Sequence, residues 1–284
     1  MRLILQGPHL TTALTNTIAS QLHGSVISNR TYAMVECPSS IDPQQLRTLR
    51  QSAQIDINLL PSSFQSERTA LLVTDMDSTL INIECIDEIA DFAGLKPQVA
   101  AITESAMRGE LNFEASLTRR VALLQGLPVE TLERVYQERL KLNPGAEKMM
   151  AGLKKRGIKV ALVSGGFTYF TDRLKLRLGL DYTQANTLEV IDGKLSGRVV
   201  GTILGAEGKA EFLTRLCTQL GIEKTQAVAM GDGANDLKMM ALAGLSIAYH
   251  AKPAVQDQAH TALNYCGLEG VLGLLDIGLM ENMG

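Results

Sequence analysis

Three short apolar runs, each ending abruptly in small and polar residues, constrain the fold of this 284-residue chain most strongly. Residues 71–73 run into Thr74-Asp75, residues 160–163 into Ser164-Gly165-Gly166, and residues 227–230 into Gly231-Asp232-Gly233. Amphipathic helical patterns separate the runs, and this alternation is typical of βαβ units in a parallel sheet covered on both faces. Ligands of such sheets bind outside the carboxyl ends of the strands. We therefore predict a doubly wound α/β fold in which the three polar ends converge.

One long segment interrupts the alternation after the first run. The 64 residues from Leu80 to Asn143 exceed what a single crossover helix needs. Glycine and proline breaks divide this segment into several helices, near residues 94–97, 109 and 126–128. We predict an inserted helical cap at about residues 82–143. Farther on, Asp192-Gly193 separates two apolar runs of strand type, which predicts a hairpin with a type I′ turn.

The first 66 residues differ from the rest of the chain in charge. They carry only seven charged side chains, and a polar stretch near residues 61–67 is typical of a linker. The pattern before it predicts the order βαββαβ, with one helix starting at Pro43 behind an Asp42 cap. That order resembles the ferredoxin-like topology of ACT-like domains. We therefore predict a small α+β domain over residues 1–66 and a larger domain over residues 67–284.

The composition restricts the partners and the compartment. The formal net charge is −3, and no run of positive charge offers a surface for nucleic acid. No apolar stretch reaches the roughly 18 to 20 residues that cross a bilayer, and no signal-peptide pattern opens the chain, so we expect a cytoplasmic protein without a membrane partner. The four cysteines lie dozens of residues apart and are expected to be free thiols.

Two carboxylates, Asp75 and Asp77, stand where the first apolar run ends. A carboxylate after a buried strand costs free energy unless it is paired or used, which favours a functional site. Aspartates that only form a turn or cap a helix are the alternative. A calcium-binding EF-hand loop is excluded, because it needs glycine where Leu80 stands and glutamate where Ile86 stands.

Three further motifs are ambiguous when each is taken alone. Residues 231–236 are not a dinucleotide-binding fingerprint, because Asp236 stands where a glycine is needed. Gly208-Lys209-Ala210 lacks the first glycine and the final hydroxyl residue of a P-loop, and Lys209 alone is typical of a solvated helix position. Ser164 before two glycines is also good turn chemistry.

The four motifs together, in this order, resemble those of the haloacid dehalogenase-like hydrolase superfamily over about residues 69–275. They are Asp-x-Asp-x-Thr at residues 75–79, Ser164, Lys209 and Gly-Asp-Gly-x-Asn-Asp at residues 231–236. The intervening residues resemble the phosphoserine phosphatase family within it, through Glu84, residues 107–113, Arg120 and residues 163–167. The resemblance implies Mg²⁺-dependent hydrolysis of O-phospho-L-serine through an aspartyl-phosphate, the last step of serine biosynthesis.

The resemblance also implies a role for each residue that meets the phosphate. Asp75 is the expected nucleophile, and Asp77 is the expected general acid and then general base. Lys209, Ser164 and the amide of Gly165 are expected to bind the phosphoryl group.

A metal site is implied in the same way. The expected ligands of Mg²⁺ are the Asp75 carboxylate, the backbone carbonyl of Asp77 and Asp232, an all-oxygen set that suits this ion. Asp236 is expected to hold Lys209 in place.

Substrate recognition is expected to come from the cap, because the four motifs see only phosphate. By resemblance, Glu84 would bind the substrate's ammonium group and Arg120 its carboxylate. Phe113 would shield the site from water, and Asn235 would help to position the substrate. Since Arg119 adjoins Arg120 on a predicted helix, one of the two is expected to be merely solvated.

Two other functions stay open at this point. The same fold could act on another small phosphomonoester, such as phosphohomoserine or a sugar phosphate. A non-catalytic phospho-acceptor, like a receiver domain, is the second alternative, although it has no need for a general acid such as Asp77. We also expect a homodimer, because a four-stranded sheet with one open face tends to bury that face against a second copy. A chain starting near Ser66 is expected to fold and to keep its turnover.

Overall fold

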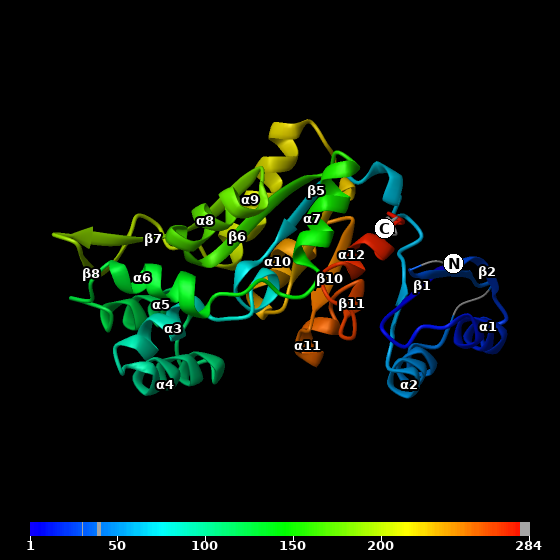
Figure 1. The fold of residues 1–284 in the computed structure, drawn as a ribbon, viewed down its shortest axis with the longest axis horizontal. Coiled ribbons are helices and arrows are strands. Elements are labelled where there is room, and N and C mark those ends of the chain that lie inside the picture. Colours follow the sequence, from blue (N-terminus) through cyan, green and yellow to red (C-terminus); the bar gives the residue numbers. More distant parts are fainter. Residues whose placement is uncertain (30, 39–40, 279–284) are drawn as a thin grey trace.

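The computed structural model describes residues 1–29, 31–38 and 41–278 (Figure 1). Its centre is a seven-stranded sheet in the order β11-β10-β9-β5-β6-β7-β8. These strands are β5 (Leu71–Thr74), β6 (Lys159–Phe167), β7 (Tyr182–Ile191), β8 (Lys194–Val200), β9 (Ala227–Gly231), β10 (Leu245–Tyr249) and β11 (Thr261–Leu263). Strand β8 runs antiparallel to β7, and the other neighbours pair in parallel. The predicted α/β sheet is confirmed.

Helices cover both faces of this sheet because each central strand is apolar on both sides. Leu72 and Val160 pack on one face against α7 (Ala146–Lys155), α8 (Thr168–Leu178) and α12 (Gly270–Leu274). Leu71 and Val73 pack on the other face against α9 (Ala206–Leu220) and α10 (Leu237–Met240), beside α11 (Pro253–Gln256). The sheet is therefore doubly wound, as the apolar runs predict.

A helical insertion leaves the sheet directly after β5. It contains α3 (Cys85–Phe92), α4 (Lys96–Met107), α5 (Phe113–Ala122) and α6 (Glu130–Arg134), followed by the π-turn η3 (Val135–Arg139). The helix breaks fall at the predicted glycines. The chain enters and leaves through adjacent segments, where Ile81 pairs with Leu142 and the Asn143 side chain donates hydrogen bonds to the carbonyls of Thr79 and Ile81. These contacts fix the insertion to the carboxyl end of β5.

The predicted hairpin is formed by β7 and β8 and extends beside the insertion (Figure 1). Its two turn residues, Asp192 and Gly193, have φ of 49° and 73°, the left-handed pair that a type I′ turn needs. The backbone of Leu195 exchanges hydrogen bonds with Gly126 and Leu127, so the hairpin supports the segment between α5 and α6.

The N-terminal elements follow the predicted order βαββαβ. They are β1 (Arg2–Gln6), α1 (Thr12–Gln21), β2 (Ser25–Asn29), β3 (Ala33–Glu36), α2 (Pro43–Ala53) and β4 (Asp56–Leu59). The strands form a second, antiparallel sheet in the order β2-β3-β1-β4. Asp42 caps α2 by accepting a hydrogen bond from the amide of Gln44, as predicted.

The face of this small sheet that α1 and α2 leave free is not open, which corrects the argument for a twin. Ile4, Met34 and Phe64 join the same apolar cluster as Val271 and Leu272 of α12. Figure 1 shows α12 between the two sheets. The expectation rested on counting strands and helices within residues 1–66, and that count omits a helix from the far end of the chain. The homodimer therefore stays a prediction, but an open face of the small sheet no longer supports it.

Polar contacts also tie the two sheets together. The side chain of Asn58 donates to the carbonyl of Ala262 and accepts from its amide, and so pairs with β11 as a strand would. Buried Asp56 accepts hydrogen bonds from the amides of Asn264 and Cys266 at 2.8 and 2.9 Å. Since such groups cost free energy when they lose their partners, residues 1–66 are tightly docked.

The four cysteines are free, as predicted, and the structure shows that all four are buried: Cys37, Cys85, Cys217 and Cys266. In the described ranges, no helix has the length and apolar character needed to cross a membrane.

Candidate active site

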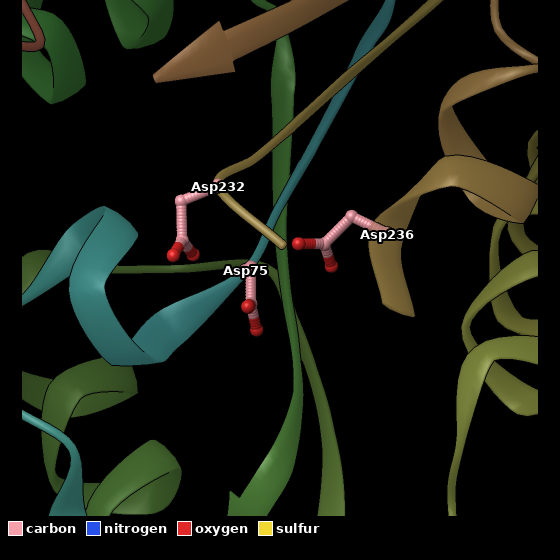
Figure 2. Close-up of side chains that lie close together, drawn as sticks. All are labelled: Asp75, Asp232 and Asp236. Atoms are coloured by element: carbon pink, nitrogen blue, oxygen red, sulfur yellow. The ribbon is translucent and has the colours of Figure 1, made fainter. Parts of the chain in front are cut away.

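The three polar strand ends converge at one edge of the large sheet, as the sequence predicts. Strands β9, β5 and β6 are neighbours, so Asp232, Asp75 and Ser164 are brought to the same place. Figure 2 shows the carboxylates of Asp75, Asp232 and Asp236 close together. Asp75 directly follows β5, Asp232 directly follows β9, and Asp236 lies a few residues farther on. One difference concerns β6, which continues past Ser164 to Phe167, where irregular pairing with β7 lets buried Phe167 pair with Asn186.

Lys209 is the centre of the buried part of the site. Its Nζ lies 2.7 Å from Oδ1 of Asp75 and 2.7 Å from Oδ1 of Asp236, and all three side chains are shielded from water. Helix α9 places Lys209 opposite β5. The interpretation of Lys209 as a solvated residue is therefore wrong, and Asp236 holds Lys209 as expected. A buried ammonium is tolerated here because two carboxylates compensate it.

The pKa values reflect this mixture of burial and charge. Burial, which by itself lowers the pKa of Lys209, is outweighed by Asp236 and Asp75, so its pKa is raised and the ammonium stays charged. Burial and then the neighbouring Asp236 raise the pKa of Asp75 well above its usual range, against the opposing effect of Lys209. The carboxylates outnumber the ammonium, so the site has a charge that a cation would balance.

The donor set fits a divalent cation. Oxygen atoms of Asp75, Asp232 and Asp236 lie within 4.8 Å of one another. Both oxygens of Asp236 already have partners, Lys209 at 2.7 Å and the amide of Gly233 at 3.1 Å. Asp75 and Asp232 are therefore better placed than Asp236 to bind an ion, and carboxylate oxygens are ligands that Mg²⁺ prefers.

Asp77 stands beside this cluster at the start of the insertion. Its Oδ1 accepts a hydrogen bond from the amide of Cys85 at 3.2 Å, in the first turn of α3. Desolvation raises the pKa of Asp77 to about 6, against the hydrogen bonds from Cys85. A carboxyl group with such a pKa can both donate and accept a proton near neutral pH.

Ser164 and Gly165 form the β6 side of the site. Ser164 is buried, and its Oγ accepts a hydrogen bond from the amide of Gly166 at 2.8 Å. The Asn186 side chain donates to the carbonyl of Gly165 at 2.8 Å and fixes this irregular stretch. A Cβ at Gly165 would lie 2.8 Å from the ring of Phe113, so glycine is needed for Phe113 to lie over the strand end.

The insertion contributes Glu84, Phe113 and Arg120 around the same edge. Glu84 is open to solvent, and partial desolvation followed by the charge of Asp77 raises its pKa to about 8. Arg120 is half-buried; desolvation lowers its pKa, and the nearby carboxylates of Asp87, Glu84 and Asp77 oppose that shift. The mouth of the site therefore has a carboxyl group and a guanidinium group close to each other, and an ammonium group of a substrate would favour the ionised form of that carboxyl group.

The two adjacent arginines differ as expected. Arg119 is exposed, whereas Arg120 turns toward the site and its Nε donates to the carbonyl of Ser116 at 3.4 Å. Asn235 lies in the short turn η5 (Ala234–Asp236), with its side chain beside Gly233. All the residues predicted for the site are thus found around one edge of the sheet.

Comparison with known proteins agrees with this geometry. The family model of the haloacid dehalogenase-like hydrolases matches residues 69–244, which include β5, β6, β9 and the buried cluster. The chain belongs to this family. A phosphoserine phosphatase of Polaromonas sp. strain JS666 is 54% identical over 224 residues, which cover 77% of this chain and 95% of that protein. One of Vibrio cholerae serotype O1 is 48% identical over 233 residues, covering 82% and 71%.

Solved structures of phosphoserine phosphatases are also similar to this hydrolase. A probable phosphoserine phosphatase from Vibrio cholerae, in unliganded form, has a TM-score of 0.85 at 41% identity and covers 97% of this chain and 86% of that one. A substrate-bound phosphoserine phosphatase complex has a TM-score of 0.68 at 45% identity, covering 72% and 98%. These relatives show that this member of the haloacid dehalogenase-like hydrolases is a phosphatase.

Several residues of this phosphatase site are missing from the sequence-based prediction. Thr79 donates a hydrogen bond through Oγ1 to Oδ1 of Asp232 at 2.9 Å and so orients a candidate metal ligand. Its signal is present, as the last residue of the Asp-x-Asp-x-Thr motif. Asn186 and Ser78 have no such signal, because the contacts that they make join segments whose approach only the fold determines.

Proposed function

We propose that this phosphatase hydrolyses O-phospho-L-serine to L-serine and phosphate. The observation that carries the proposal is the pairing of a buried cluster, built on Asp75 and Lys209, with a carboxyl group and a guanidinium group at its mouth, Glu84 and Arg120. Phosphoserine has an ammonium and a carboxylate group next to its phosphate ester, and so complements both groups once Glu84 is ionised against the ammonium. The names of the relatives support this assignment.

In the first chemical step, a carboxylate oxygen of Asp75 attacks the phosphorus atom and the bond to the serine oxygen breaks. Lys209, Ser164 and the amide of Gly165 stabilise the charge on the phosphoryl oxygens. Asp77 gives its proton to the departing serine oxygen. The products of this step are L-serine and a phosphorylated Asp75.

In the second step, water attacks the phosphorus atom of the aspartyl-phosphate. Asp77, now ionised, takes a proton from that water, and phosphate leaves with regeneration of the Asp75 carboxylate. The amide of Cys85 keeps Asp77 oriented through both steps. One carboxyl group with a pKa raised to about 6 can serve both directions of proton transfer.

Mg²⁺ is the proposed cofactor, held by Asp75, the backbone carbonyl of Asp77 and Asp232. When bound, it neutralises charge between the phosphate and the attacking carboxylate. Thr79 orients Asp232 by its hydrogen bond, and Asp236 serves Lys209 rather than the ion.

The insertion is the proposed cap, at about residues 82–143. Glu84 would bind the ammonium group of the substrate and Arg120 its carboxylate, with Asn235 beside the ester. Phe113, which lies against Gly165, would exclude water from the phosphate. Residues 1–66 form the proposed ACT-like domain with its ferredoxin-like topology, and the enzyme would act at the last step of serine biosynthesis.

The test is release of phosphate from L-phosphoserine with and without Mg²⁺. We expect turnover only with the ion, and a kcat/KM at least about tenfold above that for phosphohomoserine or a sugar phosphate, since those do not place both charged groups at the same distance from phosphate. Preference for another monoester would reassign the substrate but keep the chemistry. Stoichiometric phosphorylation of Asp75 without turnover would favour the phospho-acceptor.

A further inference from the structure

Ser78 occupies an unusual backbone position between the two parts of the site. Its φ is 55°, in the left-handed region that non-glycine residues rarely adopt. Its amide donates to the carbonyl of Ile83 at 3.2 Å, and its Oγ donates to Oε1 of Glu84 at 2.7 Å. One residue therefore closes the loop between Asp77 and α3 with both its backbone and its side chain.

Glu84 has little else to fix its side chain. It is the residue before α3, yet its carboxylate makes no capping bond to that helix. It is also partly exposed to solvent, so packing constrains its rotamer only weakly. A free glutamate side chain loses considerable conformational entropy when it is ordered by a ligand. Among the described residues, the hydroxyl of Ser78 makes a direct hydrogen bond to the Glu84 carboxyl group without any ligand present.

We propose that Ser78 is a positioning residue for substrate selection, which holds Glu84 in the orientation that receives the ammonium group of the substrate. This inference rests on the proposed function. A hydroxyl suits the task, because it donates to one oxygen of the Glu84 carboxyl group, which favours the ionised form, and leaves the other oxygen for the ammonium group. A lysine or arginine at residue 78 would compete with the ammonium group itself.

The backbone supports a functional reason for serine at this position. Glycine adopts a positive φ without steric cost, so a loop selected for stability alone would favour glycine here. Serine has a steric cost at this φ that glycine lacks, but it supplies the hydroxyl. Strained positions of this kind concentrate at functional sites.

Two variants separate the hydroxyl from the backbone. Ser78→Ala removes the hydroxyl and keeps the steric cost, whereas Ser78→Gly removes both. We expect each to raise KM for phosphoserine by roughly three- to tenfold with little change in kcat, the range for one hydrogen bond of modest net strength. For 3-phosphonooxypropanoate, which is phosphoserine without its amine, we expect a change below about twofold, because this substrate has no group for Glu84.

Thermal stability provides a second measurement. Ser78→Gly is expected to be as stable as the parent or more stable, while its KM for phosphoserine rises. Gln54→Gly is the matched control: Gln54 also has a left-handed φ, 52°, but caps α2 far from the site. It should change stability in the same direction and leave both substrates unaffected. In a Glu84→Gln background, Ser78→Ala should add less than about twofold.

The outcomes distinguish this inference from the proposed function. Failure of the parent enzyme to prefer phosphoserine over the analogue without an amine would overturn both. If the parent has that preference but both Ser78 variants keep its KM, only the role of Ser78 is refuted. Equal losses on both substrates would also refute it, since they would show that Ser78 maintains the backbone around Asp77 instead of orienting Glu84.

Discussion

The two ends of the active site are built in opposite ways. At the end where we propose that phosphate binds, called the phosphate end, Asp75, Lys209 and Asp236 are buried and joined by ion pairs of 2.7 Å. At the mouth, Glu84 and Arg120 lie on the insertion, more exposed than the buried cluster, and each makes a hydrogen bond to a neighbour, Ser78 or the carbonyl of Ser116. The first group is fixed by buried ion pairs between β5, α9 and η5 at the sheet edge, and the second depends on a few local contacts.

This difference matches what each end has to do. Charges that stabilise a transferring phosphoryl group act best when they are fixed and shielded from water, because reorganisation then costs least. Groups that select the substrate must be open enough to admit it. The contrast predicts that changes at the phosphate end affect every substrate, whereas changes at the mouth affect only substrates with the matching group.

The largest effect should come from Asp75→Asn, which removes the proposed nucleophile at nearly constant volume. We expect kcat to fall by a factor on the order of 10⁴ or more for every phosphomonoester, as for other covalent nucleophiles. Circular dichroism and thermal melting should show a folded protein, since Asp236 still pairs with Lys209. Turnover within tenfold of the parent would remove Asp75 from the mechanism.

Removal of the metal should be next in size. EDTA is expected to reduce turnover of all substrates by roughly 10³-fold, and added Mg²⁺ to restore it, because the ion supplies several kcal/mol of charge stabilisation. Asp232→Ala should reproduce the chelated state and respond weakly to Mg²⁺. The control is Thr79→Val, which keeps the ligand but removes its hydrogen bond and should weaken Mg²⁺ binding to a smaller extent. Full activity in EDTA would contradict the metal site.

Asp77 tests the phosphate end through the leaving group. Asp77→Asn should lower kcat/KM for phosphoserine by about 10²- to 10⁴-fold, the usual contribution of a general acid. It should affect p-nitrophenyl phosphate much less in kcat/KM, because p-nitrophenolate leaves without a proton.

The pH dependence has a definite sign. In the proposed mechanism the acid form of Asp77 is needed for the first step, and desolvation raises its pKa to about 6. Ionisation of Asp77 should therefore make kcat/KM for phosphoserine fall above that pH, by up to tenfold per pH unit. A profile for p-nitrophenyl phosphate that falls in the same way would assign the pH effect to another group.

Arg120→Ala should have a smaller and more selective effect. We expect a loss of about 2 to 4 kcal/mol in transition-state binding of phosphoserine, the range for removing one partner of a desolvated charge pair. Phosphoethanolamine, which has the amine but no carboxylate, should lose little. Arg119→Ala is the matched control, because Arg119 is exposed on the same helix. Equal losses on both substrates would place Arg120 at the phosphate end.

The sequence predicts the phosphate end better than the rest of the molecule. An apolar run that stops at a carboxylate identifies a buried strand and its polar end in one pattern, so Asp75 and Asp232 are found locally. Lys209 is different. Its helix pattern alone indicates a solvated residue, and only the resemblance to a family indicates that it belongs to the site; its burial comes from the structure. No local pattern reveals that Asn186 bonds Gly165 across two strands.

The docking of the first 66 residues illustrates the same limit. In β4, Asp56 and Asn58 alternate with Ile57 and Leu59, so they lie on one face of the strand. A polar face of this kind is usually solvated, and nothing local indicates that backbone amides 200 residues away will cover it. The cost of covering it is offset by hydrogen bonds from Ala262, Asn264 and Cys266, which only the fold brings within reach.

Removal of residues 1–65 should have the smallest effect on turnover, because neither end of the site contains a residue from that region. For the fraction that folds, kcat for phosphoserine should stay within about twofold of the parent. Stability should fall, since the truncation exposes the apolar surface of α12 that Ile4, Met34 and Phe64 cover. Because the contacts that are lost bury about three apolar side chains, we expect the free energy of unfolding to fall on the order of 5 kcal/mol, or the melting temperature by roughly 10 °C.

Asp56→Ala in the full chain should reproduce part of that loss, because it leaves the amides of Asn264 and Cys266 without their acceptor. If the truncated protein melted like the parent but lost its turnover, the contrast between two ends would be incomplete, and the N-terminal sheet would have to act on the mouth through β11.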